Sequence, residues 1–134
     1  MTLKLLSSVR VLELAIEIPG NQAPCILADM GADVIKIEPP PVGDYVREVY
    51  PLEMPDQIER HYGVGVAHLM FNRNKRSVAL DLKQEEGREV FYRLLATTDI
   101  VFDLSIPGTR TKLQVDYESC RKRKPKKFKL SLTN

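Results

Sequence analysis

The sequence predicts an α/β fold, an open and mainly parallel sheet with flanking helices. The first observation is that strand-like segments rich in β-branched residues are separated by segments whose apolar residues recur at helical spacing. The second is that the strand-like segments 9–14 and 32–37 flank a short helical segment at 23–30. This order makes a βαβ unit, which implies a parallel strand pair with a right-handed crossover. The alternation continues along the chain, so we expect a single Rossmann-like domain over residues 1–134.

Local signals place the individual elements. Pro19, Gly20 and Asn21 predict a break after the first strand, with Asn21 as the N-cap of the first helix. Gly31 is suited to end that helix. The apolar residues of 84–96 form one stripe, which predicts an amphipathic helix. The predicted strands are 9–14, 32–37, 77–82, 99–103 and 128–132, and the predicted helical segments are 23–30, 67–71, 84–96, a turn ending at 113, and 116–122.

A long Pro-rich loop is predicted from residue 38 to residue 65. Prolines at positions 39, 40, 41, 51 and 55 exclude a helix or a strand through most of this stretch. Loops of this length inside a compact domain are usually functional or disordered. The sequence leaves both possibilities open for this loop.

Composition excludes several classes of protein. The chain is 43% hydrophobic and 28% charged, which is ordinary for a globular domain. No apolar run approaches the roughly 18 residues of a membrane helix, so no membrane partner is expected. Cys25 and Cys120 lie far apart in the sequence, which favours reduced thiols in a cytoplasmic protein. His61 and His68 have no third ligand at a sensible spacing, so we expect no metal site.

The net charge of +2 is unevenly distributed. Residues 121–129 carry seven of the 20 Lys and Arg residues, which leaves the first 120 residues with 13 basic and 18 acidic side chains. A basic run of this kind raises the question of a nucleic-acid partner. It contains one aromatic residue, Phe128, and its lysines also suit the solvent-facing side of a helix end and a strand. We therefore do not expect a nucleic-acid partner.

Common catalytic and phosphate-binding motifs are missing from the sequence. It contains no GxGxxG or GxxxxGK[ST] motif, and its histidines do not form a recognisable catalytic arrangement with a nucleophile. Residues 72–77, Asn-Arg-Asn-Lys-Arg-Ser, are the most polar internal segment. They form either a solvated turn before a strand or a basic turn at the edge of a phosphate-bearing ligand site.

Several segments in register carry a resemblance that extends over almost the whole chain. The segment Leu27–Glu38 is the most distinctive, and Asn72–Ser77 with Leu80–Lys83 forms a second signature. Together they resemble the family III CoA-transferases, the group that includes formyl-CoA transferase, carnitine CoA-transferases and α-methylacyl-CoA racemase. The other matching segments are Val9–Leu14, Gly43-Asp44, Glu86–Arg88, Asp99–Val101, Pro107-Gly108, Lys124–Lys126 and Ser131–Thr133.

The resemblance implies a Rossmann-like domain that binds coenzyme A or an acyl-CoA as substrate, without a metal. It also implies a nucleophilic aspartate that forms acyl-aspartyl and aspartyl-CoA intermediates, or a proton transfer beside the thioester in the racemase branch. The chain resembles only the N-terminal third of a family member, and the position of that aspartate follows the strand that Ser131–Thr133 resembles. No catalytic residue is therefore assigned, and we expect this chain to be inactive alone.

The resemblance also implies a set of CoA-binding residues. Lys83 and Lys112 are candidates for phosphate contacts, and each is equally compatible with a solvated surface lysine. Pro39 stands where many members carry an Arg, and Leu104-Ser105 replaces Asn-Phe. The implied CoA-binding residues are Ile18, Leu80, Lys83, Lys112 and Leu113.

Two functional hypotheses follow. The chain is either a piece or subunit of a CoA-transferase that acts with the rest of the fold, or a non-catalytic association protein derived from that family. Because family members form interlocked dimers, the resemblance implies a homodimer or a complementary chain as partner.

Overall fold

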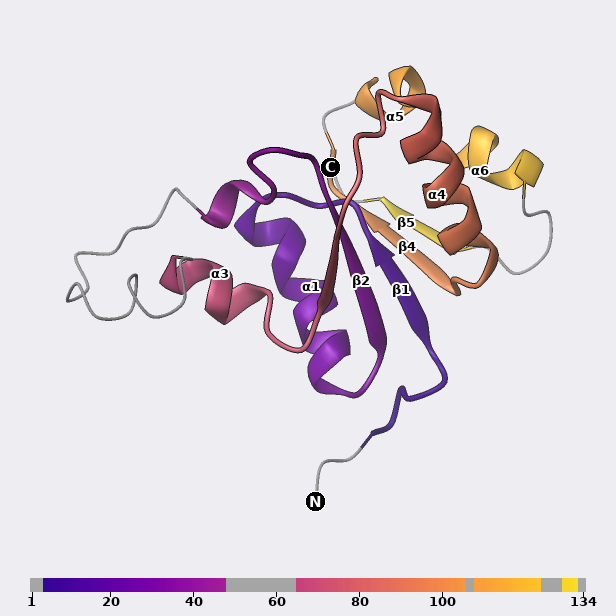
Figure 1. Ribbon diagram of the computed structural model, residues 1–134. Coiled ribbons are helices and arrows are strands. Elements are labelled where there is room, and N and C mark those ends of the chain that lie inside the picture. Colours follow the sequence, from indigo (N-terminus) through magenta and orange to yellow (C-terminus); the bar gives the residue numbers. More distant parts are fainter. Residues whose placement is uncertain (1–3, 48–64, 106–107, 124–128, 133–134) are drawn as a thin grey trace.

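The computed structural model describes residues 4–47, 65–105 and 108–123, and the backbone of 129–132. Its centre is a five-stranded sheet in the order β3-β2-β1-β4-β5, in which every neighbouring pair is parallel (Figure 1). The predicted open, parallel α/β fold is therefore confirmed. The strands are β1 (Arg10–Glu13), β2 (Asp33–Glu38), β3 (Arg76–Ala79), β4 (Ile100–Asp103) and β5 (Lys129–Leu132).

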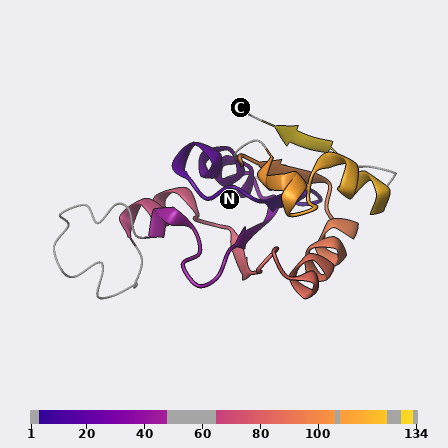
Figure 2. The same ribbon diagram turned by 90° about the horizontal axis from the view of Figure 1, so that it is seen from above.

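Helices cover both faces of this sheet. Figure 2, viewed from above, shows α1 and α4 on opposite sides of the strands. No helix in the described part of the chain is long and apolar enough to cross a membrane. The helical segments are α1 (Ile18–Asp29), the 3₁₀ turn η1 (Tyr45–Arg47), α3 (Val66–Phe71), α4 (Glu85–Ala96), α5 (Thr109–Lys112) and α6 (Tyr117–Arg123).

The sheet buries apolar side chains on each face, because successive residues of a strand point to opposite sides. On one face, Leu12 belongs to a cluster with Phe91 of α4 and Cys120 of α6. On the other, the adjacent Val11 belongs to a cluster with Ala28 of α1. Parallel sheets are usually covered in this way, and their strands are buried on both sides.

Helix α1 begins earlier than the sequence predicts. The expected break at Pro19, Gly20 and Asn21 is wrong, because α1 starts at Ile18 and continues through all three residues. Proline is tolerated in a first helical turn, where its missing N–H has no intrahelical acceptor in any case. Asn21 is not the N-cap, a position that Glu17 occupies without a side-chain cap bond.

The predicted end of α1 at Gly31 is confirmed. Gly31 has φ of +99°, a left-handed conformation that glycine adopts readily. Its N–H donates to the Ala28 carbonyl at 2.9 Å, and the Ala32 N–H donates to the Leu27 carbonyl at 3.0 Å. This pair of bonds is the Schellman arrangement that satisfies the last carbonyls of a helix.

The predicted Pro-rich loop lies only partly within the described residues. Residues 48–64 lie outside them, as does the basic segment 124–128. The described beginning of the loop turns at Gly43, which has φ of +80°, and enters η1. Val46 of η1 is 1% exposed, so this end of the loop packs into the domain.

Candidate functional site

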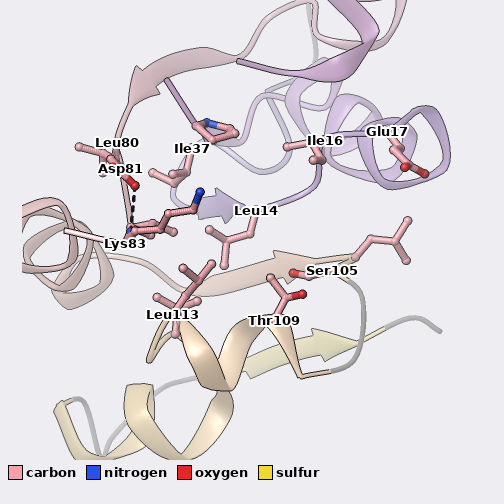
Figure 3. Close-up of a pocket in the computed structure, with 14 residues that line it drawn as sticks. Leu14, Ile16, Glu17, Ile37, Leu80, Asp81, Lys83, Ser105, Thr109 and Leu113 are labelled. Atoms are coloured by element: carbon pink, nitrogen blue, oxygen red, sulfur yellow. Dashed lines mark hydrogen bonds between the residues drawn. The ribbon is translucent and has the colours of Figure 1, made fainter. Parts of the chain in front are cut away.

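A cavity of about 330 Å³ lies at the carboxyl ends of the strands (Figure 3). The segments that follow β1, β2, β3 and β4 all contribute to it, together with residues in and after α5. We call this cavity the strand-end pocket. Its lining residues are Leu14, Ile16, Glu17, Ile37, Pro39, Leu80, Asp81, Leu82, Lys83, Leu104, Ser105, Thr109, Leu113 and Val115.

The sheet topology explains why a pocket forms here. Adjacent strands β1 and β4 lead to opposite sides of the strand order, since β1 is followed by β2 and β4 by β5. The segments that leave β1 and β4 therefore diverge, which opens a crevice beyond their carboxyl ends. Open α/β sheets bind their ligands at this topological switch point.

The lining of the strand-end pocket is mainly apolar, with a small number of polar residues. Figure 3 shows the Lys83 side chain extending toward Leu14 and Ile37. Lys83 is the one cationic residue among the described residues that line the pocket. Glu17 and Asp81 are the two acidic residues among them. An apolar cavity with a few convergent polar groups is typical of a small-molecule site.

The turn between β3 and α4 fixes the backbone of Lys83. The Lys83 N–H donates to Asp81 Oδ1 at 3.0 Å, and the Lys83 carbonyl accepts from Arg88 of α4 at 2.8 Å. Helix α4 approaches this turn closely at Gly87, where a Cβ atom would lie 2.1 Å from the Asp81 carbonyl oxygen. A glycine at this position therefore allows α4 to pack against the turn that carries Lys83.

The turn after β4 is held by a buried carboxylate. Asp103 is 1% exposed and accepts a hydrogen bond from the Ser105 N–H at 2.9 Å. Its other oxygen, Oδ2, lies 2.8 Å from Arg110 Nε. Arg110 lies in α5, so this ion pair joins the two sides of the turn. The contact fixes the part of the pocket wall that contains Leu104 and Ser105.

The structure brings three of the five sequence-predicted CoA-binding residues together. Leu80, Lys83 and Leu113 line the strand-end pocket. Ile18 and Lys112 do not line it, although each is the immediate neighbour of a lining residue, Glu17 and Leu113 respectively. Lys112 is exposed at the end of α5.

Residues that depart from the family pattern also lie at this pocket. Pro39, Leu104 and Ser105 all line it. Pro39 offers no positive charge where many family members carry an Arg. The cationic character of the described lining therefore depends on Lys83.

A buried network of charged and amide side chains lies behind the pocket wall, and sequence reasoning missed it. Glu13 and Lys36 face each other on neighbouring strands, and Lys36 Nζ donates to Glu13 Oε1 at 2.8 Å. Lys36 Nζ also lies 3.0 Å from Asp44 Oδ2, and Lys75 Nζ lies 2.8 Å from Glu13 Oε2. Asn21 joins the network by donating to Asp44 Oδ2 at 2.7 Å. We call these five residues the buried ionic network.

The signal for this network was present in the sequence but ambiguous. The sequence predicts a strand at 9–14 but does not show which of its side chains are buried. Because helices cover both faces, Glu13 is 0% exposed and Lys36 is 1% exposed. Charged residues in a central strand need partners. Once the sheet order is known, Glu13 and Lys36 occupy paired positions, and this pairing predicts a buried ion pair.

Burial changes the proton affinities within the network. Burial raises the pKa of Glu13 above its usual range, even though Lys36 and Lys75 favour the carboxylate. Burial lowers the pKa of Lys75, against the attraction of Glu13. Burial also disfavours the Asp44 carboxylate, but Lys36 and the Val46 N–H outweigh this effect and hold the pKa of Asp44 below its usual value. Each of these shifts reflects a balance between burial and the attraction of an opposite charge.

The polar turn 72–77 serves the fold through these contacts. Lys75 joins the buried ionic network, and Arg76 pairs with Asp33 at 2.7 Å. Arg73 Nε donates to Asp29 Oδ1 at 3.2 Å. The cations of this turn are therefore paired with carboxylates of the same chain, and none of its residues lines the strand-end pocket.

The described residues contain no group of three or more His, Cys, Asp or Glu side chains arranged to hold a metal ion. His68 is half-buried, and burial lowers its pKa. Its Nδ1 lies 3.0 Å from the Asn72 side-chain nitrogen. His61 lies outside the described residues.

A parallel sheet covered on both faces, with a pocket at its switch point, defines a Rossmann-like α/β protein. More particularly, the chain belongs to CoA-transferase family III, whose family model matches residues 6–127. Similar proteins support this membership. The chain is 40% identical over 128 residues to succinate–glutarate CoA-transferase of Agrobacterium fabrum, covering 96% of this chain and 32% of that protein.

Two further comparisons agree. The chain is 36% identical over 104 residues to the alpha subunit of succinyl-CoA–L-malate CoA-transferase of Chloroflexus aurantiacus, covering 78% of this chain and 23% of that protein. The crystal structure of the hypothetical protein Rv3272 of Mycobacterium tuberculosis superposes with a TM-score of 0.80 at 31% identity, covering 95% of this chain and 32% of that one. The chain thus spans about a third or less of the length of these relatives.

Proposed function

We propose that residues 1–134 form the CoA-binding N-terminal portion of a family III acyl-CoA:carboxylate CoA-transferase, as a single Rossmann-like unit. The observation that carries this proposal is the strand-end pocket at the switch point of the sheet. Leu80 and Lys83 of the turn between β3 and α4 meet Leu113, at the end of α5, in this pocket, and the family resemblance assigns all three to CoA. CoA or an acyl-CoA is the substrate that this pocket receives, in a protein of the cytoplasm.

The chemistry of the lining suits the two kinds of surface that CoA presents. The apolar side chains, such as Leu14 and Leu113, offer contacts for the adenine ring or the pantetheine arm. The Lys83 ammonium offers a partner for a phosphate, and exposed Lys112 lies next to the lining residue Leu113. Ile18, the first residue of α1, directly follows the lining residue Glu17. Each of the five residues that the resemblance assigns to CoA thus lies in the pocket lining or next to it.

We propose further that this chain transfers no acyl group or CoA alone. Covalent transfer through an acyl-aspartyl intermediate needs a free carboxylate nucleophile. Of the two carboxylates in the described lining, Asp81 holds the turn by accepting from the Lys83 N–H. The family resemblance places the nucleophilic aspartate after the strand that Ser131–Thr133 resembles, so we expect it from the remainder of the fold, in further sequence, a second copy or a complementary chain. The relative named as an alpha subunit supports an arrangement with another chain.

A second candidate is a non-catalytic association protein derived from the family. Helices α1 and α3 pack against each other and carry exposed apolar side chains. Ile26 is 50% exposed and Met70 is 53% exposed. Exposed apolar side chains of this size favour contact with another protein surface when they are contiguous.

The experiment is a thermal melt followed by circular dichroism, with and without CoA, together with calorimetric titration. A ligand at about 100 times its dissociation constant adds roughly 2.7 kcal/mol to the folded state. We expect CoA to raise the melting temperature, and Lys83→Met to weaken binding about tenfold. The matched control is Lys122→Met, which removes an exposed lysine of α6 that lies outside the lining. A wild-type melt that CoA leaves unchanged would refute the proposed site and favour the association protein.

A further inference from the structure

The pocket wall between β1 and α1 has few local anchors of its own. Leu14, Ile16 and Glu17 of this segment line the strand-end pocket. Helix α1 then begins without a side-chain cap bond from Glu17, and its first turn contains Pro19 and Gly20. Glycine is a weak helix former, and proline provides no amide donor to its surroundings. The position of this wall therefore depends on contacts from elsewhere in the fold.

Two buried ammonium groups supply those contacts. Lys36 Nζ donates to the Ala15 carbonyl at 2.5 Å and to Asn21 Oδ1 at 2.7 Å. Lys75 Nζ donates to the Asn21 carbonyl at 2.9 Å. The acceptors at Ala15 and Asn21 bracket residues 16–20, so both ends of the wall are fixed to ammonium groups that other strands and turns position.

Glu13 in turn holds both ammonium groups. Its Oε1 accepts from Lys36 Nζ at 2.8 Å and from Lys75 Nζ at 3.0 Å. Lys36 belongs to β2, and Lys75 immediately precedes β3. The Glu13 carboxylate therefore holds the ammonium groups of Lys36, in β2, and Lys75, just before β3, next to the first residues after β1.

The cost of such a network points to a role beyond stability. Taking charges out of water is unfavourable, and a buried ion pair can often be replaced by packed apolar residues without loss of stability. Here the ammonium groups also satisfy main-chain carbonyls that carry the pocket wall. We propose that Glu13, Lys36 and Lys75 are positioning residues, which hold residues 15–21 in the arrangement that receives CoA. This inference rests on the proposed function of the strand-end pocket.

The test is a paired variant, Glu13→Gln with Lys75→Met, that removes one charge of each sign. The matched control, Asp33→Asn with Arg76→Met, removes a partly exposed ion pair, whose members do not line the pocket. Urea unfolding first establishes a temperature at which both variants are more than about 99% folded, a condition that requires about 2.7 kcal/mol of stability. Under that condition, a purely structural role of Lys75 leaves the dissociation constant of CoA unchanged.

We expect the paired variant to raise the dissociation constant of CoA at least tenfold, whereas the control stays within about twofold. Hydrogen exchange gives a second measurement that needs no ligand. The amides of residues 16–20 should exchange faster in the paired variant, while those of β1 and β4 keep their protection. If the paired variant fails to fold, Lys75→Gln replaces it, because Glu13 then keeps Lys36 as its partner.

The outcomes separate this inference from the proposed function. If wild-type protein binds CoA and the paired variant binds within twofold, the positioning role is overturned and the CoA site stands. Faster exchange at residues 16–20 with unchanged CoA affinity also overturns it, since the wall would then be immaterial to the ligand. Wild-type protein that binds no CoA overturns the proposed function and the ligand role together. Weaker binding combined with faster local exchange supports the proposal.

Discussion

Several buried polar contacts converge on Lys36. Its ammonium group touches two carboxylates, Glu13 at 2.8 Å and Asp44 at 3.0 Å, although the side chain is only 1% exposed. Lys36→Met keeps the length of the side chain but leaves both carboxylates short of a cation. Breaking a buried pair in this way typically costs about 3–5 kcal/mol. We expect a loss of this size in the free energy of unfolding, measured by urea denaturation.

An exposed ion pair gives the comparison for Lys36. Arg76→Met removes a contact to Asp33 at 2.7 Å, but the two side chains are 61% and 32% exposed. Exposed pairs contribute up to about 1 kcal/mol, because water and salt screen them. Equal losses for Lys36→Met and Arg76→Met would contradict the importance of burial in the network.

Glu38 gives a pH dependence whose direction is defined. Burial disfavours its carboxylate, but hydrogen bonds from Arg47, Ser77 and the Asp44 N–H outweigh burial and lower the pKa of Glu38 from 4.5 to about 2. The folded state therefore binds this proton less tightly than the unfolded state. The stabilisation is complete above about pH 5 and is lost as the pH falls from about 4.5 toward 2, with a total of about 3 kcal/mol.

The pH dependence is measured by urea unfolding from pH 7 down to pH 2. Glu38→Gln should lose stability at pH 7 and show a smaller further loss below pH 4.5 than the wild type. Glu118→Gln, at an exposed position on α6, should follow the wild-type curve. Parallel curves for Glu38→Gln and the wild type would show that another carboxyl group causes the acid sensitivity.

At the residue level, three of the five residues expected to bind CoA lie at the pocket, whereas the network was not predicted. Leu80, Lys83 and Leu113 could be named because the family resemblance carries their positions. Glu13 could not be recognised as buried, because the sequence alone does not show that both faces of its strand are covered. Glu13 is buried because helices cover both faces of the sheet, and its carboxylate is paired with Lys75, which is distant in sequence. Such long-range partners become visible only when the strand order is known.

At the level of elements, the packing of α4 depends on one glycine. A Cβ atom at Gly87 would lie 2.1 Å from the Asp81 carbonyl oxygen and 2.8 Å from its carbon. Alanine favours helix by about 1 kcal/mol over glycine. Even so, we expect Gly87→Ala to destabilise the protein by about 1–3 kcal/mol, because α4 must move away from the backbone of the turn. A thermal melt by circular dichroism measures the change.

The matched control for Gly87 is Glu86→Ala, at the preceding exposed position of α4. It changes helix propensity without placing an atom against the turn, so its effect should stay within about 0.5 kcal/mol. If the Gly87→Ala variant were as stable as the wild type or more stable, the turn at Asp81 would be able to move away from α4 without loss of stability.

Elements were predictable where local signals agreed with the packing. The amphipathic stripe predicted α4 within one residue at its start, and Gly31 correctly marked the end of α1. The predicted beginning of α1 was wrong, because Pro-Gly-Asn is a turn signal when considered alone. In the folded protein, Asn21 is fully buried and bonded to Lys36 and Asp44, and these contacts hold the first turn in the helix. Tertiary contacts thus overrode a local preference.

At the level of the whole molecule, the packing of helices on the sheet buries both cysteine side chains. Cys120 is 0% exposed and Cys25 is 2% exposed. Burial, with Asp116 and Asp103 nearby, raises the pKa of Cys120 from 9.0 to about 12. Since the thiolate is the reactive form, we expect native Cys120 to react with iodoacetamide at pH 8 about a thousandfold more slowly than a free thiol.

Mass spectrometry measures this labelling. The rate at Cys120 should rise with urea in parallel with unfolding, and a Glu118→Cys variant provides an exposed thiol on the same helix that reacts at once. Native Cys120 that reacts as fast as the added thiol would mean that α6 leaves the sheet readily without global unfolding.

The strand order also determines when the chain can complete its sheet. Strand β1 lies at the centre, and its partner β4 is distant in sequence: the Arg10 N–H bonds to Asp99, 89 residues away. Parallel strands cannot pair through a tight hairpin, so this junction must wait for a long stretch of chain. At a synthesis rate of about 5–20 residues per second, the wait lasts roughly 5 to 20 seconds. Throughout it, Val11 and Leu12 lack their β4 neighbours, and β1 keeps an unpaired strand edge, a feature that favours association with other chains.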